Sequence, residues 1–201
     1  MAVEFAHHQP FNRADKLALL ATLLRRIPYL TEADIAACLP LWTKAVTLKR
    51  NDFLIRAGQV EHHLYFVASG AMRIYLPDAS EEICVGFAYG TSLICSFPSF
   101  VENRPSDYCI QALKKTELLA VSRADFLVLL DSNANFARFW RMELERVLVG
   151  RIEREIDLLL PEPERRLQRL LARSPHLFQL IPKKYIASYL RMTPETLSRL
   201  R

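Results

Sequence analysis

An acidic and a basic side chain near the end of the chain have the spacing of a nucleobase-reading pair. Glu195 and Arg199 lie in the segment TPETLSRLR, and on a helix their separation of four residues places both on one face. Arg donates to O6 and N7 of guanine, and Glu accepts from N4 of cytosine. The alternative reading is an ordinary ion pair along an exposed helix.

Two short helices must position this pair. Five apolar residues fall at inward-facing positions: Ile186, Ala187, Leu190, Leu197 and Leu200. Between the two groups, Thr193 is suited to cap the second helix and Pro194 to be its first residue. Packing of the two helices would leave Glu195, Ser198 and Arg199 on or near the outer side.

The stretch IASYLRMTPETLSR resembles the helix-turn-helix of the Crp/Fnr bacterial regulators, whose signature is roughly A-x-x-L-G-L-x-x-E-T-V-S-R. The matching residues are Ala187, Leu190, Met192, Glu195, Thr196, Leu197, Ser198 and Arg199. The resemblance implies that Glu195 and Arg199 contact bases, whereas Thr196 and Ser198 approach phosphates.

Two residues depart from that signature. Arg191 stands where the turn glycine is usual, and a positive φ is costly for residues other than Gly or Asn, so the residue type leaves the tightness of this turn open. Pro194 stands where the family often has an arginine, which removes one possible base contact.

Positive charge is concentrated in the same part of the chain. Residues 161–201 hold nine Lys and Arg against three acids, a net charge of +6, whereas the whole chain carries +5. A basic segment on a near-neutral body is expected of a domain that sits on phosphates, with a solvated basic surface as the alternative. Lys183 and Lys184 are the predicted phosphate contacts that accompany the four helix residues.

Composition indicates a folded, cytoplasmic protein. The 201 residues are 51% hydrophobic, enough for one large or two small domains, yet no apolar run is long enough to span a membrane. The N-terminal segment has no signal-peptide pattern. The four cysteines, Cys38, Cys84, Cys95 and Cys109, are widely spaced and are expected to be reduced core thiols without a metal.

The middle of the chain predicts an antiparallel sandwich. Short runs rich in Val, Ile, Phe and Tyr are separated by turn residues, and no βαβ alternation is visible. The expected strands are 45–48, 52–55, 63–68, 71–75, 82–89, 107–112 and 116–121. Helices are expected at 12–26, from Thr31, and at 123–130. The predicted class is α+β, with N-terminal helices and an antiparallel jelly-roll (double-stranded β-helix) sandwich.

A long helix is predicted from about Asn135 to Leu160. Its apolar stripe recurs every four residues and includes Trp140, Leu144, Leu148, Ile152 and Ile156. A helix of this length extends beyond a small sandwich, so we expect a second copy of the chain to cover part of the stripe. The alternative is that the helix only lies along its own domain. Pro161 and Pro163 should end it in a stiff hinge.

These elements divide the chain into three parts that match the Crp/Fnr order. They are a cyclic-nucleotide-binding-like sensor domain (residues 1–134), a dimerisation helix (135–160) and a helix-turn-helix DNA-binding domain (161–201). The expected function is transcription regulation by a homodimer on palindromic double-stranded DNA, with RNA polymerase as a candidate further partner. Neither enzymatic activity nor a cofactor is expected.

The phosphate cassette of the cyclic-AMP-binding members is degenerate here. Alignment on Phe100 and the CIQA run places Cys95-Ser96 at the family's Gly-Glu and Ser106-Asp107 at its Arg-Ser, so both essential charges are missing. Asp107 would repel a phosphate, and Arg104 is the one nearby substitute. We therefore expect no response to cyclic AMP through this cassette.

Two other classes of function compete. Aromatic side chains could form an apolar effector pocket or simply core: Tyr65, Phe87, Tyr89, Phe97, Phe100 and Tyr108. A small-molecule or cyclic-nucleotide sensor module without a DNA role is therefore the main alternative. A cupin-type metalloenzyme is disfavoured, because the adjacent His62 and His63 would point to opposite faces of a strand.

Overall fold

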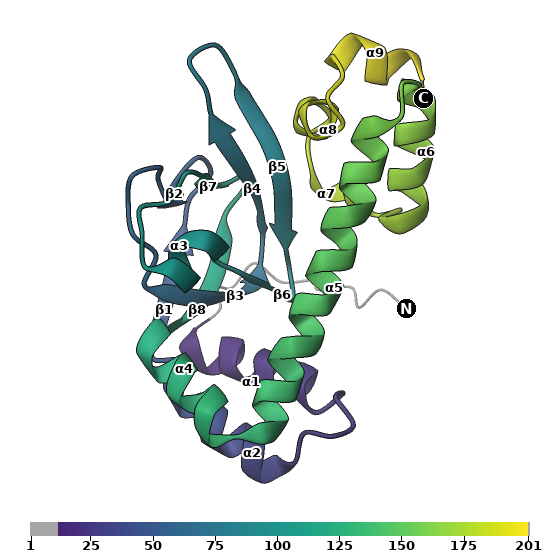
Figure 1. Cartoon of the computed structure of the whole chain (residues 1–201). Helices are drawn as coiled ribbons and strands as arrows, with labels where there is room; N and C mark the ends of the chain where they lie inside the picture. The colour runs from purple at the N-terminus through teal and green to yellow at the C-terminus, as the bar shows by residue number, and fades with distance from the viewer. Residues whose placement is uncertain (1–11, 201) are drawn as a thin grey trace.

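The computed structural model describes residues 12–200, whose elements follow the predicted order (Figure 1). N-terminal helices lie at one end of a β-sandwich, a long helix runs along the molecule, and four short helices end the chain. The mixture of helices and antiparallel sheets confirms the predicted α+β class. Residues 1–11 of the predicted sensor domain and Arg201 lie outside the described residues.

The N-terminal helices begin where their capping residues predict. They are α1 (Arg13–Leu24), α2 (Glu32–Cys38) and the single 3-10 turn η1 (Leu39–Leu41). Asn12 caps α1 in a capping box with Asp15, and Thr31 caps α2 in the same way with Asp34. Leu20 and Leu24 turn inward and join the core beneath the sandwich.

Eight strands form two four-stranded antiparallel sheets. They are β1 (Lys44–Leu48), β2 (Phe53–Ile55), β3 (His63–Ser69), β4 (Ala71–Pro77), β5 (Glu82–Tyr89), β6 (Ser92–Ile94), β7 (Cys109–Ala112) and β8 (Thr116–Ser122). One sheet has the order β1-β8-β3-β6 and the other β2-β7-β4-β5. Seven strands match the prediction, whereas the three-residue strand β6 and the following helix α3 (Phe97–Glu102) were not predicted.

Gly70 allows the chain to pass from one sheet to the other. It joins β3 to β4 with φ of +105°, a conformation that favours glycine. A Cβ atom at this position would lie 2.4 Å from Oγ1 of Thr116. No other residue fits this turn without moving the start of β8.

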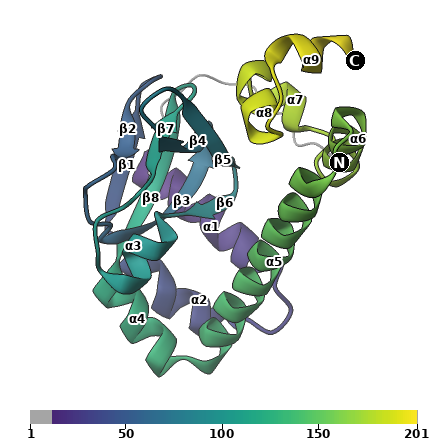
Figure 2. The same ribbon diagram turned by 45° about the horizontal axis from the view of Figure 1, so that its top comes forward.

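Helix α5 (Ala134–Leu159) follows the shorter α4 (Arg123–Ser132) and is the longest element. Its 26 residues extend over about 39 Å. Phe136 and Trp140, in its first two turns, pack into the core beneath the β-sandwich, whereas its second half leads to the C-terminal helices (Figure 2). None of the described helices is both long and apolar enough to cross a bilayer.

The C-terminal helices form a core of their own that also includes the sandwich. They are α6 (Pro163–Arg173), α7 (Leu177–Leu180), α8 (Lys183–Tyr189) and α9 (Pro194–Arg199), of which α7 was not predicted. Their buried leucines and isoleucines pack with Ala71, Phe87 and Tyr89 of β4 and β5. Figure 1 shows α8 beside β5, so the C-terminal helices are docked on the β-sandwich.

Candidate functional site

Helix α9 presents the predicted outward face. Thr193 caps it by accepting the amide hydrogen of Thr196 at 3.1 Å, and Pro194 is its first residue. Leu197 is 1% exposed and fixes the rotation of the helix. Glu195 and Arg199 therefore point to solvent, with Ser198 between them.

Glu195 and Arg199 interact electrostatically, since hydrogen bonds and also the charge of Arg199 lower the pKa of Glu195, but the charged atoms of the two residues do not come within 4.0 Å of each other. Within residues 12–200, Glu195 and Arg199 are not joined by an ion pair, although they share a face of α9. Hydrogen bonds from its own amide and from the Thr193 hydroxyl lower the pKa of Glu195. Its side chain is an acceptor at neutral pH, and Arg199 remains a donor.

Thr196 differs from the other residues of α9 that were predicted to contact DNA. Its hydroxyl lies 3.1 Å from the hydroxyl of Thr193, so it belongs to the cap and is only partly exposed. Ser198 is exposed on the outer face. Of the two predicted phosphate contacts on α9, only Ser198 has a side chain directed to solvent.

Arg191 forms the tight turn despite its side chain. It adopts φ of +52°, and the amide of Met192 donates to the carbonyl of Ala187 at 3.0 Å. The turn is therefore tight, although an arginine stands where the signature has glycine. Arg166 offsets the strain, since one of its nitrogens donates to the carbonyls of Leu190 at 2.9 Å and Arg191 at 3.1 Å.

Much of the basic charge of the C-terminal segment is used within the protein. Arg169 and Arg173 pair with the fully buried Asp157 of α5, and Arg191 pairs with Glu81 at 3.0 Å. Arg165 pairs with Glu162 at the surface. Fewer basic side chains of this segment are therefore left without an acidic partner than the net charge of the sequence suggested.

Lys183 and Lys184 are both exposed at the start of α8. The ammonium of Lys184 lies 4.8 Å from the ring centroid of Tyr185. Together with Arg199, these lysines are the basic side chains of α8 and α9 that lack a described carboxylate partner.

Backbone groups of the edge strand β5 hold the C-terminal helices. Ser188 on α8 accepts the amide hydrogen of Cys84 at 3.0 Å and donates to the carbonyl of Glu82 at 3.2 Å. Arg154 on α5 donates to the carbonyls of Cys84 and Tyr189, each at 3.3 Å. Because β5 lies at a sheet edge, these side chains replace part of the missing strand partner. No pattern of residues in the sequence indicates this contact.

The exposed side of α5 differs in part from the predicted stripe. Trp140 packs within its own chain, where its ring lies edge-on against Phe126 at a centroid distance of 4.9 Å. Leu144 is half-buried. The exposed apolar residues of the helix are Met142, Val147, Leu148, Val149, Ile152, Ile156 and Leu159. Within this set, Val149, Ile152, Ile156 and Leu159 follow the three-and-four spacing of a coiled-coil seam.

The predicted cassette residues separate into a buried and an exposed pair. The hydroxyls of Ser96 and Ser106 meet at 2.6 Å in the interior. Arg104 points outward, where it pairs with Glu102 and lies 2.9 Å from Asp107. The only guanidinium of the predicted cassette is therefore neutralised at the surface.

A buried carboxyl group, which the sequence did not reveal, occupies the cassette instead. Glu61 is 2% exposed, and it accepts the amide hydrogens of His63 at 3.1 Å and Ser96 at 3.4 Å. Burial raises its pKa to about 7. A cyclic phosphate placed here would meet this carboxyl group and no buried cation of the cassette, so these residues do not fit the phosphate.

The predicted aromatic walls do not enclose one pocket. Tyr65 lies in the core between the sheets, Phe100 lies beneath the sandwich, and Phe87 and Tyr89 pack against the C-terminal helices. Phe97 is largely exposed. Of the two alternatives, the structure favours core packing for Tyr65, Phe87, Tyr89 and Phe100 over a shared effector pocket.

Comparison with known families identifies the fold of the central domain. Residues 45–133, from β1 to the end of α4, match the cyclic nucleotide-binding domain family. No curated protein sequence matches the chain.

Several solved structures share a larger part of the architecture. FixK2 from Bradyrhizobium japonicum has a TM-score of 0.68 at 16% identity, over 78% of this chain and 81% of its own. A CooA mutant from Carboxydothermus hydrogenoformans has a TM-score of 0.65 at 17% identity, over 78% and 73%. The c-di-GMP-responsive global regulator CLP from Xanthomonas campestris has a TM-score of 0.64 at 16% identity, over 85% and 89%. At these identities the similarity establishes a common fold.

Proposed function

We propose that the chain is a sequence-specific DNA-binding transcription regulator of the Crp/Fnr type, acting in the cytoplasm as a homodimer. The observation that carries the proposal is the outer face of α9, where Glu195, Ser198 and Arg199 are exposed on a capped helix. Glu195 and Arg199 are not paired with each other, so each is available to a base edge in the major groove. Lys183 and Lys184 would contact phosphates beside it.

The dimer would form along the exposed seam of α5. Val149, Ile152, Ile156 and Leu159 are apolar side chains in solvent on the single chain. Pairing with the same seam of a second copy removes them from water and relates two α9 helices by a twofold axis. Two such helices would read half-sites about 34 Å apart.

The sensor domain would respond to something other than a cyclic nucleotide held by the usual cassette. The carboxyl group of Glu61 is buried beside Ser96, whereas Arg104 is exposed and paired with Asp107 at the surface. Charge and hydrogen bonding therefore both oppose a phosphate bound at the predicted cassette. The fold shared with FixK2, CooA and CLP supports the regulator part of the proposal. No enzymatic role is proposed.

The alternative is a sensor module without a DNA role. Its specific support is the docked position of α8 and the internal use of Arg169 and Arg173. Such a module would retain the dimer and bind duplex DNA no better than other basic proteins.

Selection from random duplex DNA, followed by fluorescence anisotropy at 50 and 200 mM salt, separates the two functions. A regulator should enrich a palindrome and bind it far more tightly than random DNA at both salt concentrations. Both affinities should fall with salt as counterions are released. Absence of an enriched sequence, with equal affinity for all duplexes, would rule out the proposed regulator.

A further inference from the structure

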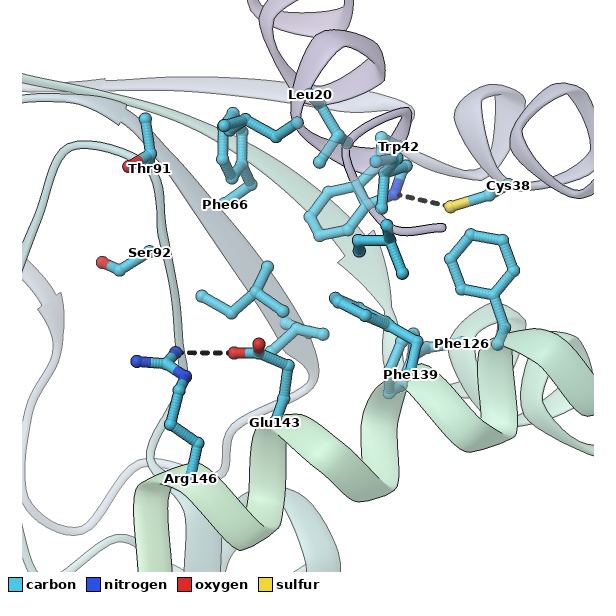
Figure 3. Close-up of a pocket in the computed structure, with 16 residues that line it drawn as sticks. Leu20, Cys38, Trp42, Phe66, Thr91, Ser92, Phe126, Phe139, Glu143 and Arg146 are labelled. Atoms are coloured by element: carbon cyan, nitrogen blue, oxygen red, sulfur yellow. Dashed lines mark hydrogen bonds and ion pairs between the residues drawn. The ribbon is translucent and has the colours of Figure 1, made fainter. Parts of the chain in front are cut away.

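A cavity of about 180 Å³ lies outside the cassette, between α1, the sandwich and the first turns of α5 (Figure 3). Folded interiors leave few voids larger than a water molecule. In another protein, an engineered apolar cavity of about 150 Å³ is enough to hold benzene. The cavity therefore matches the size of a single substituted aromatic ring.

The walls suit such a ring. Most of the lining is apolar, and the aromatic residues are Trp42, Phe66, Phe126, Phe136 and Phe139. Figure 3 shows rings from the strand side and the helix side facing the same space. Aromatic rings attract one another in offset and edge-on arrangements, so a bound ring gains more than burial alone.

One side of the lining is polar and electrically balanced. Arg146 donates to Oε2 of Glu143 at 2.6 Å, and both side chains rise from α5 (Figure 3). Because the charges of Glu143 and Arg146 cancel, this side of the cavity favours a neutral ligand over an ion. The remaining oxygen of Glu143 has no described protein donor within residues 12–200, so it can accept a hydroxyl hydrogen.

A strained residue borders the same space. Thr91 lines the cavity in the turn between β5 and β6 with φ of +71°, although its side chain is β-branched. Such a conformation is a true outlier that the surroundings must impose, and outliers of this kind gather at ligand sites. The amide of Thr91 donates to the carbonyl of Val67 at 2.7 Å, which holds the turn in place.

We infer that this cavity binds a small neutral aromatic molecule carrying a hydroxyl group, with its ring between Trp42 and Phe139 and its hydroxyl towards Glu143. The inference concerns binding alone and does not rest on the proposed DNA role.

Calorimetric titration and thermal unfolding with p-cresol and toluene test it. Both probes should bind saturably to the unmodified chain and raise its Tm. Leu23→Phe fills the cavity from a half-buried position on α1 and should weaken both probes at least about tenfold. Absence of saturable binding for both probes, or unchanged affinity in a folded Leu23→Phe protein, overturns the site.

A second variant tests the polar side independently of the packing. Glu143→Gln removes the charge and should weaken p-cresol about tenfold while leaving toluene unchanged. The control is Glu145→Gln, an exposed residue of the same helix outside the lining, which should bind both probes as the unmodified chain does. Equal effects of Glu143→Gln on the two probes would contradict the placement of the hydroxyl.

Discussion

The hydroxyl of Ser188 accepts the backbone amide hydrogen of Cys84 at 3.0 Å, which ties α8 to the edge strand β5 of the sandwich. The same hydroxyl donates to the carbonyl of Glu82, so a single side chain serves two groups of β5. Any movement of α8 away from the sheet must break both bonds. The contact therefore couples the exposure of this strand edge to the position of α8 and of α9, which follows it.

Replacing Ser188 with alanine should loosen the edge of the sheet. Loss of the hydroxyl removes the acceptor for the Cys84 amide, a bond worth about 1 kcal/mol. Hydrogen exchange at Cys84 should then quicken about fivefold, provided that exchange follows local opening. Ser198→Ala, on the exposed face of α9, is the matched control and should leave that rate unchanged.

Val149→Glu should convert the proposed dimer to a monomer. Val149 is 60% exposed on the seam of α5, and pairing would bring two like charges together in an apolar contact. Sedimentation equilibrium measures the change in mass. Val128→Glu makes the same substitution at a 65% exposed position on α4 and should remain dimeric. A monomeric unmodified chain would contradict the proposed interface directly.

Arg199→Ala and Lys183→Ala should affect DNA binding in different ways. Loss of a base-reading guanidinium should cost about 1–3 kcal/mol on the selected site and relax its sequence preference. Loss of Lys183 should weaken specific and random DNA alike and reduce the salt slope by about one. The base-reading role fails if Arg199→Ala weakens both kinds of DNA equally.

Glu61→Gln should change how stability depends on pH. Burial raises the pKa of Glu61 to about 7, whereas an unfolded glutamate has a pKa of about 4.3. Between about pH 4.3 and about pH 7 the folded state holds a proton on Glu61 that the unfolded state has lost. The free energy of unfolding therefore falls as pH rises through this range, and the contribution of Glu61 is constant at higher pH.

Glutamine cannot ionise, so the variant should gain about 3 kcal/mol relative to the unmodified chain between pH 5 and pH 8. Urea unfolding at the two pH values measures the difference. The exposed Glu155→Gln should show the pH dependence of the unmodified chain. Parallel stabilities for Glu61→Gln and the unmodified chain would show that Glu61 is ionised in the fold.

Gly150→Ala should stabilise the protein by about 1 kcal/mol. Gly150 lies within α5, and a Cβ atom there would meet no other atom within 4 Å, so alanine gains only helix propensity. Gly58→Ala has the same open surroundings but a φ of +87°, so it should destabilise by about 1 kcal/mol. Thermal unfolding of both variants measures the change in stability. The same added methyl group should raise Tm at position 150 and lower it at position 58.

Residue periodicity predicted the long elements because their packing is local. The stripe of α5, the capping pair of Thr31 and Asp34, and the inward Leu197 depend on neighbours a few residues away. The cap of α9 was predictable for the same reason. Short elements carry too few residues for a period, so β6 and α7 were missed. Helix α3 did carry a signal, since Ser96 and Pro98 are suited to its start.

Contacts between distant segments could not be read from the pattern. Arg191 forms the turn because Arg166, 25 residues earlier, holds its carbonyl. Trp140 faces inward because Phe126 lies across from it on α4. Glu61 is buried although the chain shows only an ordinary acid beside two histidines. Each outcome depends on which surfaces meet after folding.

Helix α5 connects the cavity to the C-terminal helices. Its base forms one wall of the cavity, and its far end carries Asp157, which fastens α6 through Arg169 and Arg173. Over about 39 Å, a tilt of about 5° at the base sweeps the tip through about 3 Å. Arg154, on the same half of α5 as Asp157, donates to the carbonyls of Cys84 and Tyr189, so such a tilt would pull on both β5 and α8.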